Sequence, residues 1–475
     1  VEIHAHTGYL VDQFMSRLWN LRTDEWGGDV AGRLRFPIEI VRAIRQRVGP
    51  RLPIGFRLTA EHRIDGGRTL DEAVEMARRL EEAGVDALTV DAGCYEAEHW
   101  MNPPVYHGEA CLADLAGAVR GAVGIPVIAV GNLTRPEVAE AVLERGQADF
   151  VALGRSLLAD PHWALKAREG RGGEIRPCIM CNEYCLGRFP AECMVNAALG
   201  RERESEVTPA ATAKTVVVVG GGPGGMEAAR VAALRGHRVT LYEREEELGG
   251  QLLPASDAVF KDSLRGLRDN LRLQMEQAGV EVVLGAELTS ERVRELAPQA
   301  VVVATGAGPI EPGIPGIRHE KNVTVLALHT GKGRSLGARV VVAGGGLNGC
   351  DVAVDLALAG KQVVLVERNG EVGRDLNHVS RGGLLHRLET HGVEILTGHE
   401  VVAFTDAGVT VRAGAGEERL LPADTVVLAM GAVARNELVE PLKRTVPELY
   451  AVGDCLKPRK IGEAIHEGFR VGLRL

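Results

Sequence analysis

Hydrophobic residues over the first 165 positions form short apolar runs separated by stretches in which they recur every three or four residues. The runs predict strands and the recurrences predict amphipathic helices. Helical crossovers of this kind join parallel strands, so the pattern predicts part of a (β/α)8 barrel. The missing strands would precede Val1, and the chain is therefore expected to be truncated at its N-terminus, with little barrel activity of its own. The expected strands are Val1–Ala5, Ile54–Leu58, Ala87–Asp91, Val127–Val130 and Phe150–Leu153, and the expected helices include Arg33–Val48, Thr69–Ala83 and Pro136–Arg145.

A second α/β pattern begins at Lys214 and occurs twice. Val216–Gly225 is echoed by Val340–Gly349, and each copy consists of an apolar strand, a glycine-rich loop and the start of a helix. The first glycine of each loop lies 23 positions before an acid, Glu243 or Glu367. This context favours two nested Rossmann units over tight turns without a ligand. The glycines expected to approach a pyrophosphate are Gly220, Gly222 and Gly225 in the first loop and Gly344, Gly346 and Gly349 in the second.

Four of the eight cysteines fall between the two regions: Cys178, Cys181, Cys185 and Cys193. A thiolate quartet suits an iron–sulfur cluster or a structural zinc ion. Spacers of two, three and seven residues fit poorly with the paired CxxC pattern of zinc ribbons. An iron–sulfur cluster is therefore favoured, and zinc or free buried thiols are the alternatives. The other four, Cys94, Cys111, Cys350 and Cys455, are expected to be small buried hydrophobes.

Charge, hydropathy and cysteine distribution exclude several classes of partner and location. The net charge of −9 argues against a nucleic-acid partner, because no basic surplus is available to neutralise phosphates. No apolar run approaches the length of roughly 18 residues that spans a bilayer, and no secretory signal pattern is present. The cysteine distribution is not a disulfide framework, which favours the reducing cytoplasm. The expected partner is a small molecule, and homo-oligomerisation stays open.

The nucleotide region resembles the two-dinucleotide-binding flavoprotein superfamily. The resemblance rests on Glu243–Leu252, Ala304–Gly306 and Ala451–Asp454. It implies FAD at the first loop and a nicotinamide nucleotide at the second. Glu367 would repel a 2′-phosphate, which favours NADH, although the adjacent Arg368 keeps NADPH open. The residues implied in FAD binding beyond the first loop and Glu243 are Arg244, Gln251, Thr305, Gly306, Gly453 and Asp454.

The N-terminal region resembles the Old Yellow Enzyme barrel in Val1–Phe14, Arg22–Gly28 and Arg33–Phe36. As a whole, the chain is similar to the branch of 2,4-dienoyl-CoA reductase, trimethylamine dehydrogenase and 2-enoate reductase. That resemblance implies FMN in the barrel and a [4Fe–4S] cluster on the four cysteines.

The same resemblance implies roles for individual residues. Arg57 would face the pyrimidine edge of FMN and stabilise the reduced flavin. Tyr9 would donate a proton to the substrate, and His4 would hydrogen-bond the substrate or the flavin. Three positions depart from the family: Thr7 replaces His or Asn, Tyr95 replaces a His of the dienoyl-CoA reductases, and the spacer before Cys193 is shorter. The residues implied in binding the FMN phosphate are Gly131, Asn132, Gly154 and Arg155.

The expected architecture is α/β: a partial (β/α)8 barrel over residues 1–165, an iron–sulfur segment and linker over 166–213, a FAD-binding domain over 214–335 and 425–475, and an NAD(P)H-binding domain over 336–424. The expected enzyme is an ene-reductase that passes electrons from NADH through FAD, the [4Fe–4S] cluster and FMN to an activated C=C bond. Tyr9, assisted by Tyr95, would protonate the α-carbon.

Three alternatives stay open. An amine dehydrogenase or desaturase could use the same scaffold, with Tyr95, Trp100 and Tyr106 forming an aromatic cage for a cation. A non-catalytic electron-transfer subunit would keep the cysteines and nucleotide loops without needing Tyr9, Arg57 or Arg155. A zinc-stabilised structural protein is the third.

Overall fold

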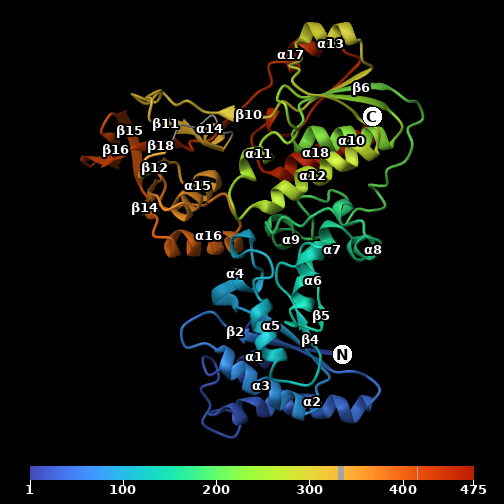
Figure 1. Cartoon of the computed structure of the whole chain (residues 1–475), viewed down its shortest axis with the longest axis vertical. Coiled ribbons are helices and arrows are strands. Elements are labelled where there is room, and N and C mark those ends of the chain that lie inside the picture. The colour runs from blue at the N-terminus through green and yellow to red at the C-terminus, as the bar shows by residue number, and fades with distance from the viewer. Residues whose placement is uncertain (330–335, 415) are drawn as a thin grey trace. The chain divides into compact units, whose positions relative to one another are not determined.

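The structure is a computed structural model that describes residues 1–329, 336–414 and 416–475. It divides into two compact units, residues 1–157 with 378–383 and residues 158–377 with 384–475 (Figure 1). Each unit has its own sheets and its own hydrophobic core. The expected domain boundary between residues 335 and 336 falls at the edge of a segment, 330–335, that lies outside the described residues.

The sheet of the first unit consists of five parallel strands that pair in chain order. Helices connect successive strands, which is the arrangement of consecutive strands in a (β/α)8 barrel. The strands are β1 (Glu2–Ala5), β2 (Gly55–Glu61), β3 (Ala87–Ala92), β4 (Val127–Ala129) and β5 (Phe150–Val151). The helices of this part of the chain are α1 (Leu10–Met15), α2 (Val30–Val48), α3 (Leu70–Glu82), η1 (Tyr95–Ala97), α4 (Glu98–Met101), η2 (Val105–His107), α5 (Ala113–Arg120), α6 (Pro136–Glu144) and α7 (Arg155–Ala159).

Strand β2 differs from its predicted bounds at both ends. Its expected first residue, Ile54, is bonded instead to the side chain of Asp86, whose Oδ2 accepts the Ile54 amide at 2.7 Å. The strand continues past Leu58 to Glu61, with a register shift against β3 between Thr59 and Glu61. Of the strand residues gained at the carboxyl end, Thr59 has its hydroxyl 2.8 Å from His6 Nδ1.

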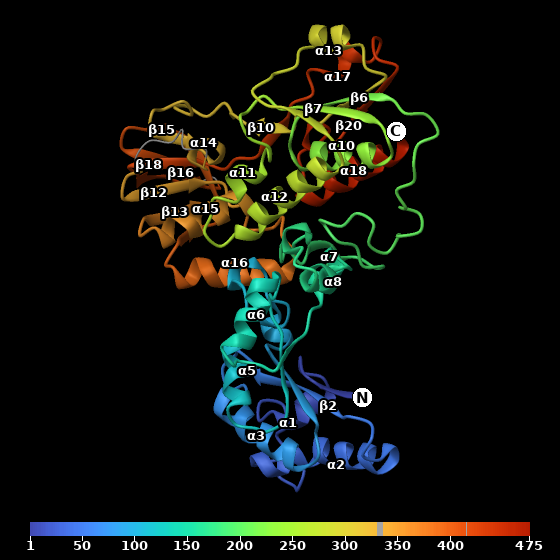
Figure 2. The same cartoon turned by 45° about the vertical axis from the view of Figure 1, so that its right-hand side comes forward.

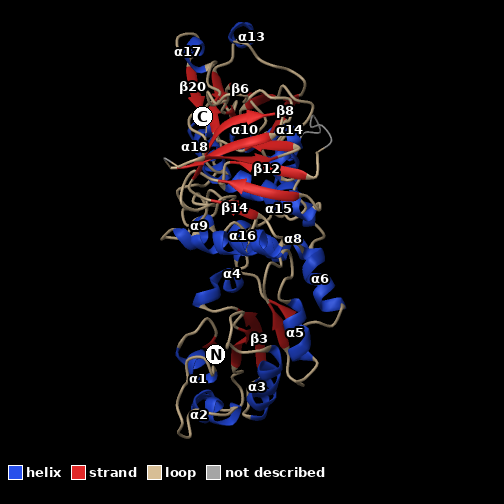
Figure 3. Ribbon diagram, turned by 90° about the vertical axis from the view of Figure 1, so that its left-hand side faces the viewer, coloured by secondary structure: helices blue, strands red, loops and turns tan. Residues whose placement is uncertain are grey.

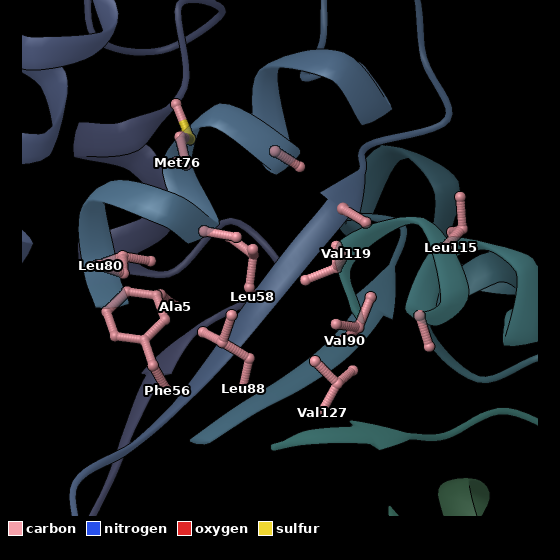
Figure 4. Close-up of a cluster of buried hydrophobic side chains, with 14 of the residues drawn as sticks. Ala5, Phe56, Leu58, Met76, Leu80, Leu88, Val90, Leu115, Val119 and Val127 are labelled. Atoms are coloured by element: carbon pink, nitrogen blue, oxygen red, sulfur yellow. The ribbon is translucent and has the colours of Figure 1, made fainter. Parts of the chain in front are cut away.

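The core of the first unit lies between the strands and the helices that cover them (Figure 4). Leu58, Leu88 and Val90 point from the strands into this core, and Leu80 and Val119 meet them from α3 and α5. These side chains are fully buried. Strand β3 is buried on both faces, whereas exposed and buried residues alternate along β1.

The second unit contains a parallel sheet with the strand order β20-β9-β6-β7-β8. Helices α10, α12 and α18 pack together beside it (Figure 2). The strands are β6 (Thr215–Val219), β7 (Arg238–Tyr242), β8 (Glu281–Val283), β9 (Ala300–Val303) and β20 (Glu448–Ala451). The helices are α10 (Pro223–Leu234), α11 (Leu252–Ala255), α12 (Asp262–Gln277), α13 (Ser290–Leu296), α17 (Val439–Leu442), η4 (Gly453–Cys455) and α18 (Ile461–Arg474).

A second parallel sheet has the order β11-β18-β12-β13-β14, with α15 beside it (Figure 3). Its last four strands repeat the arrangement β9-β6-β7-β8 of the first sheet, and the edge strand differs, since β11 precedes the others in the chain and β20 follows them. Because β20 joins the first sheet only after the second is complete, the second nucleotide unit is inserted into the first. The strands are β11 (Asn322–Thr324), β12 (Arg339–Ala343), β13 (Gln362–Val366), β14 (Glu394–Leu396) and β18 (Thr425–Leu428). The helices are α14 (Val325–His329), α15 (Leu347–Leu358) and α16 (His378–Thr390).

Two smaller antiparallel sheets complete the second unit: β15 (His399–Thr405), β16 (Gly408–Ala413) and β17 (Glu418–Pro422) form one, and β10 (Ala307–Pro309) and β19 (Ala432–Ala434) form the other. The cysteine segment precedes both nucleotide units and contains only short helices. They are α8 (Trp163–Arg168), η3 (Gly172–Glu174) and α9 (Glu183–Gly187).

Replacing Leu88 by Ala should destabilise the first unit by about 2–5 kcal/mol, because it removes a fully buried side chain and leaves a cavity. Leu21→Ala is the control, since Leu21 is 81% exposed and its loss should cost less than about 0.5 kcal/mol. Urea unfolding followed by tryptophan fluorescence measures the difference, because Trp19, Trp26 and Trp100 all lie in this unit. Equal midpoints for the two variants would contradict the assignment of this core.

Candidate functional site

Polar side chains gather at the carboxyl ends of β1, β2 and β3. In the parallel register, His4 pairs with Arg57, and Arg57 pairs with Thr89, two residues before Asp91. The carboxyl ends of parallel strands meet at one edge of a sheet, where barrel enzymes place their chemistry. The register therefore brings His4, Arg57 and the loop that carries Tyr9 to the same edge.

Tyr9 and Tyr95 form a hydrogen-bonded pair, with their phenol oxygens 2.8 Å apart. The His4 ring lies 5.1 Å from the Tyr9 ring, measured between centroids. The two tyrosines are 48% and 51% exposed. The hydrogen bond with Tyr9 raises the pKa of Tyr95, which keeps its proton in place. The three residues predicted to be catalytic are thus in contact.

Arg57 is held by a buried carboxylate that the sequence analysis did not single out. Its Nε donates to Asp91 Oδ2 at 3.1 Å, and its Nη2 donates to the same oxygen. His6 Nε2 lies 3.3 Å from that oxygen, and His6 Nδ1 lies 2.8 Å from Thr59 Oγ1. Burial lowers the pKa of His6 to about 4. The Asp91 carboxylate opposes this shift, and the Arg57 guanidinium adds to it. A neutral His6 therefore donates from Nε2 to the carboxylate and accepts from Thr59 at Nδ1.

Asp12 fixes the loop that precedes Tyr9. Its Oδ2 accepts from the Gly8 amide at 2.9 Å, and its Oδ1 lies 2.8 Å from Arg68 Nη1. His62 Nε2 is 3.3 Å from Asp12 as well. Burial alone would raise the pKa of Asp12, but Arg68 and His62 outweigh it and lower the value to about 2. The available sequence signal was an acid inside the apolar run Leu10–Met15.

Thr7 lies beside this network in a strained conformation. Its φ is 65°, which is unusual for a β-branched residue. Its hydroxyl is buried and has no hydrogen-bond partner among the described residues. Strained residues of this kind cluster at active sites and ligand clamps.

The residues expected at the FMN phosphate also lie together. Arg155 Nη2 donates to Asn132 Oδ1 at 2.8 Å, and Asn132 Nδ2 donates to the Gly108 carbonyl at 2.8 Å. Gly131 and Asn132 have φ values of 97° and 51°, a turn that follows directly after β4. Gly154 follows β5 and precedes Arg155, the first residue of α7. A guanidinium beside such a turn fits a phosphate group.

The two nucleotide loops have the same hydrogen-bond pattern. Glu243 Oε2 accepts from the Gly221 amide at 2.6 Å, and Glu367 Oε2 accepts from the Gly345 amide at 2.7 Å. A Cβ at Gly349 would lie only 1.8 Å from the Gly344 carbonyl oxygen, so the helix approaches the strand more closely than any other residue allows. Gly222 and Gly346 precede the first helical residue of α10 and α15. The backbone turn before each helix is therefore the same in the two copies.

Four of the residues implied in FAD binding beyond this loop follow the carboxyl ends of β9 and β20: Thr305, Gly306, Gly453 and Asp454. Thr305 Oγ1 donates to the Arg435 carbonyl at 2.5 Å, and the Gly453 amide donates to Glu467 at 2.7 Å. Gln251 Nε2 donates to the Ala307 carbonyl at 3.3 Å. Burial raises the pKa of Asp454. Of the remaining residues in this set, Gly306 has a φ of 69° and the exposed Arg244 pairs with Glu245 at 3.3 Å.

The four clustered cysteines form no disulfide, and their thiols influence one another electrostatically. Burial raises the pKa of Cys193 to about 11, and burial together with the other three thiols raises that of Cys181 far above its usual range. The Met180 amide donates to Cys178 Sγ at 3.4 Å. Met180 has a φ of 51°, a turn that directs this amide toward the sulfur. Backbone N–H donors to sulfur are a general feature of iron–sulfur sites.

Within residues 1–329, 336–414 and 416–475, no group of three or more His, Cys, Asp or Glu side chains is spaced to hold a single metal ion. The role of the quartet as cluster ligands is thus a prediction.

Contacts anchor the cysteine segment to both nucleotide units. His466 Nε2 on α18 lies 2.8 Å from the Cys193 carbonyl oxygen, and Lys460 Nζ lies 2.7 Å from Glu183. Asn377 Nδ2, in the loop after β13, donates to the Cys181 carbonyl at 3.0 Å. The Tyr184 ring packs so closely on Gly462 that a Cβ there would lie 2.7 Å from it. The segment is therefore fixed against the helix that follows Gly453 and Asp454.

Fold and site together define a flavin-dependent oxidoreductase that uses a pyridine nucleotide. Residues 1–174 match the NADH:flavin oxidoreductase / NADH oxidase family, and residues 214–468 match the pyridine nucleotide-disulphide oxidoreductases. The chain is 40% identical to an NADH oxidase of Thermoanaerobacter brockii, over all of this chain and 74% of that protein. It is 34% identical to a cinnamate reductase of Clostridium sporogenes, over 99% of this chain and 74% of that protein.

A solved structure of 2-naphthoyl-CoA reductase with 2-naphthoyl-CoA is similar over the whole chain and 73% of its own, with a TM-score of 0.93 and 32% identity. The chain belongs to the NADH:flavin oxidoreductase / NADH oxidase family. The expected partial barrel and nucleotide-binding folds are thereby confirmed, as are the enzyme class and the flavin and nicotinamide cofactors FMN, FAD and NAD. Among the described residues, no helix is both long and apolar enough to cross a membrane.

The stability of the first unit should fall as the pH drops from about 6.5 to about 4, because His6 takes a proton in the unfolded chain before it does in the folded one. The full effect is about 3 kcal/mol. His6→Gln should flatten this pH dependence, whereas His162→Gln, at an exposed position, should leave it unchanged. Urea midpoints at pH 7, 5.5 and 4.5 test this expectation. Parallel pH profiles for wild type and His6→Gln would show that His6 is not buried as a neutral group.

Proposed function

We propose that this protein is an NADH-dependent flavin/iron–sulfur ene-reductase that reduces an activated C=C bond. The observation that carries the proposal is the Tyr9–Tyr95 pair beside His4 and Arg57 at the carboxyl edge of a flavin-binding barrel sheet. When bound, the cofactors would supply hydride transfer at the two flavins and one-electron transfer at the cluster. The protein's own residues must bind the alkene, provide a proton and hold the cofactors.

Tyr9 is the proposed proton donor to the α-carbon of the alkene. A phenol is a competent general acid when it is positioned at the reacting atom. Tyr95 is placed to return a proton to Tyr9 across their 2.8 Å hydrogen bond.

Arg57 is the proposed cation at the pyrimidine edge of FMN. Asp91 offsets part of its charge and fixes the guanidinium plane through two donor nitrogens on one oxygen. His6 contacts the Asp91 carboxylate, and Thr59 in turn is hydrogen-bonded to His6. The Arg57 guanidinium is therefore preorganised before any cofactor binds. Asn132 and Arg155 are the proposed phosphate ligands, with Gly131 and Gly154 supplying the turns.

The four cysteines are the proposed ligands of a [4Fe–4S] cluster. The mutual influence of the thiols and the amide donor on Cys178 support this assignment, and structural zinc is the alternative. None of the eight cysteines forms a disulfide, which supports a reducing compartment such as the cytoplasm. We propose NADH rather than NADPH as the electron donor. The proposed domains are the partial barrel over residues 1–165, the iron–sulfur segment over 166–213, the FAD-binding domain over 214–335 with 425–475, and the NAD(P)H-binding domain over 336–424.

The substrate class we propose is a conjugated carboxylate or thioester. Cinnamate and 2-naphthoyl-CoA, the compounds in the names of two relatives, are both conjugated acyl compounds.

Histamine dehydrogenase is a similar structure with a TM-score of 0.86 and 26% identity, which keeps amine oxidation as the second candidate. The aromatic cage expected for an amine is not supported, because Trp100 stacks on His107 at 3.9 Å and carries Arg63 over its ring at 4.6 Å. A resident cation there opposes binding of an alkylammonium ion.

Replacing Tyr9 by Phe should lower turnover of cinnamate by about 10²-fold or more, because the general acid is lost. NADH reduction of the bound flavin should be unchanged, since Tyr9 lies outside the nucleotide units. Tyr450→Phe is the matched control: it removes a phenol whose hydrogen bond to Glu448 lies in the first nucleotide sheet. Steady-state rates and anaerobic stopped-flow traces of the holoenzyme separate the two steps. An unaffected rate for Tyr9→Phe would refute the assigned donor.

Replacing Cys181 by Ala should abolish electron flow between the flavins while FAD still accepts electrons from NADH. Iron and acid-labile sulfide should fall together in this variant and stay at wild-type levels in Cys350→Ala, which changes a buried thiol on α15. Anaerobic NADH titration followed by absorbance reports the flavins separately from the metal analysis. Wild-type protein with zinc in place of iron would overturn the cluster assignment.

A further inference from the structure

The two nucleotide loops differ in charge at one corresponding position. Gly220, Glu243 and Gly249 in the first copy correspond, at constant spacing, to Gly344, Glu367 and Gly373 in the second. Gly249 and Gly373 donate from their amides to the equivalent carbonyls of Gly221 and Gly345. The same spacing aligns Gln251 with Asp375. A neutral amide in the first copy is therefore replaced by a carboxylate in the second.

Asp375 occupies the N-terminus of α15. Its two carboxylate oxygens lie 2.9 and 3.1 Å from the backbone nitrogen of Leu347, the first residue of that helix. The corresponding residue in the first copy is Pro223, which has no amide hydrogen to donate. The N-terminus of α15 thus already carries an anion from the protein's own chain, at the place where a Rossmann unit binds the pyrophosphate of a dinucleotide.

The loop that carries Asp375 is held at both ends. On one side, the Gly373 amide donates to the Gly345 carbonyl at 2.7 Å. On the other side, Asn377 Nδ2 donates to Glu183 Oε1 at 3.0 Å and to the Cys181 carbonyl at 3.0 Å. The carboxylate is therefore positioned at the helix by the fold of the loop.

We propose that Asp375 competes with the pyrophosphate of the nicotinamide nucleotide and so weakens binding at the second loop. Two anions at one helix end repel each other, and a bound nucleotide must displace the carboxylate or share the amide with it. The consequence suits a cosubstrate, which has to leave after each turnover. The first loop, with Gln251 at this position, has no such competitor, which suits a flavin that stays bound. The inference rests on nucleotide binding at the second loop.

The test is the affinity of the oxidised holoenzyme for NAD⁺, measured by isothermal titration calorimetry at low and high salt. Asp375→Asn and Asp375→Gln should bind NAD⁺ about two- to fivefold more tightly than wild type. The gain should shrink at high salt, because screening weakens the repulsion. Glu371→Gln is the matched control, since it removes one negative charge from the same loop at a side chain that is 53% exposed and faces Arg374. It should change the affinity by less than either Asp375 variant.

Unchanged or weaker NAD⁺ binding by both Asp375 variants, with FAD content equal to wild type, would overturn the inference and leave the proposed reductase intact. A gain of the same size in Glu371→Gln would also overturn it, because the effect would then be general electrostatics. Failure of wild-type protein to bind NAD⁺ at all would overturn the nucleotide assignment itself. Retained FAD in each variant shows that the protein has folded.

Discussion

Parallel strand pairing is the constraint on which the rest of this structure depends. The sheet of the first unit and the two Rossmann sheets are parallel throughout, so within each one every strand ends at the same edge. A single strand end can offer only one or two side chains and a few backbone amides. The register of neighbouring strands brings several such strand ends together. It places His4 opposite Arg57, and it places the Gly220 loop beside the strand that leads to Thr305. The barrel site and both nucleotide loops follow from this arrangement, whereas the cysteine segment contains only short helices.

Buried charged groups restrict the backbone conformations available beside two of the candidate sites. Asp12 and Arg68 are both fully buried, and each is tolerated there only because the other is present. Between the cysteine segment and α10 a similar group contains Arg176, Glu227 and Arg230: burial opposes the charge of each, and Arg230 outweighs it to lower the pKa of Glu227. Such pairs contribute little net stability, but they leave few alternative arrangements for the backbone that carries them. In this protein that backbone includes Gly8, next to Tyr9, and Arg176, two residues before Cys178.

The sequence was sufficient for the scaffold because local patterns determine it. The apolar run at residues 87–91 predicts β3 to within one residue, and the two glycine-rich loops and their acids occupy the predicted positions. The polar network was not predictable in the same way. Asp91, His6 and Asp12 look like ordinary polar residues near strand and helix ends, and their importance comes from partners that are 34 to 85 positions away in the chain. Only the register of β1, β2 and β3 brings those partners together.

Comparison of the two Rossmann copies separates the features that the fold requires from those that can vary with the ligand. Both Rossmann copies keep the order of four strands, the close helix–strand approach and the carboxylate that binds the loop amide. The turn does not constrain the charge that faces the helix end, and this is where the copies differ, as Pro223 with Gln251 and as Leu347 with Asp375. A helix end attracts any anion, from a ligand or from the chain. The shared geometry therefore determines that a dinucleotide can bind at either loop, and the unshared side chains determine how firmly each one is held.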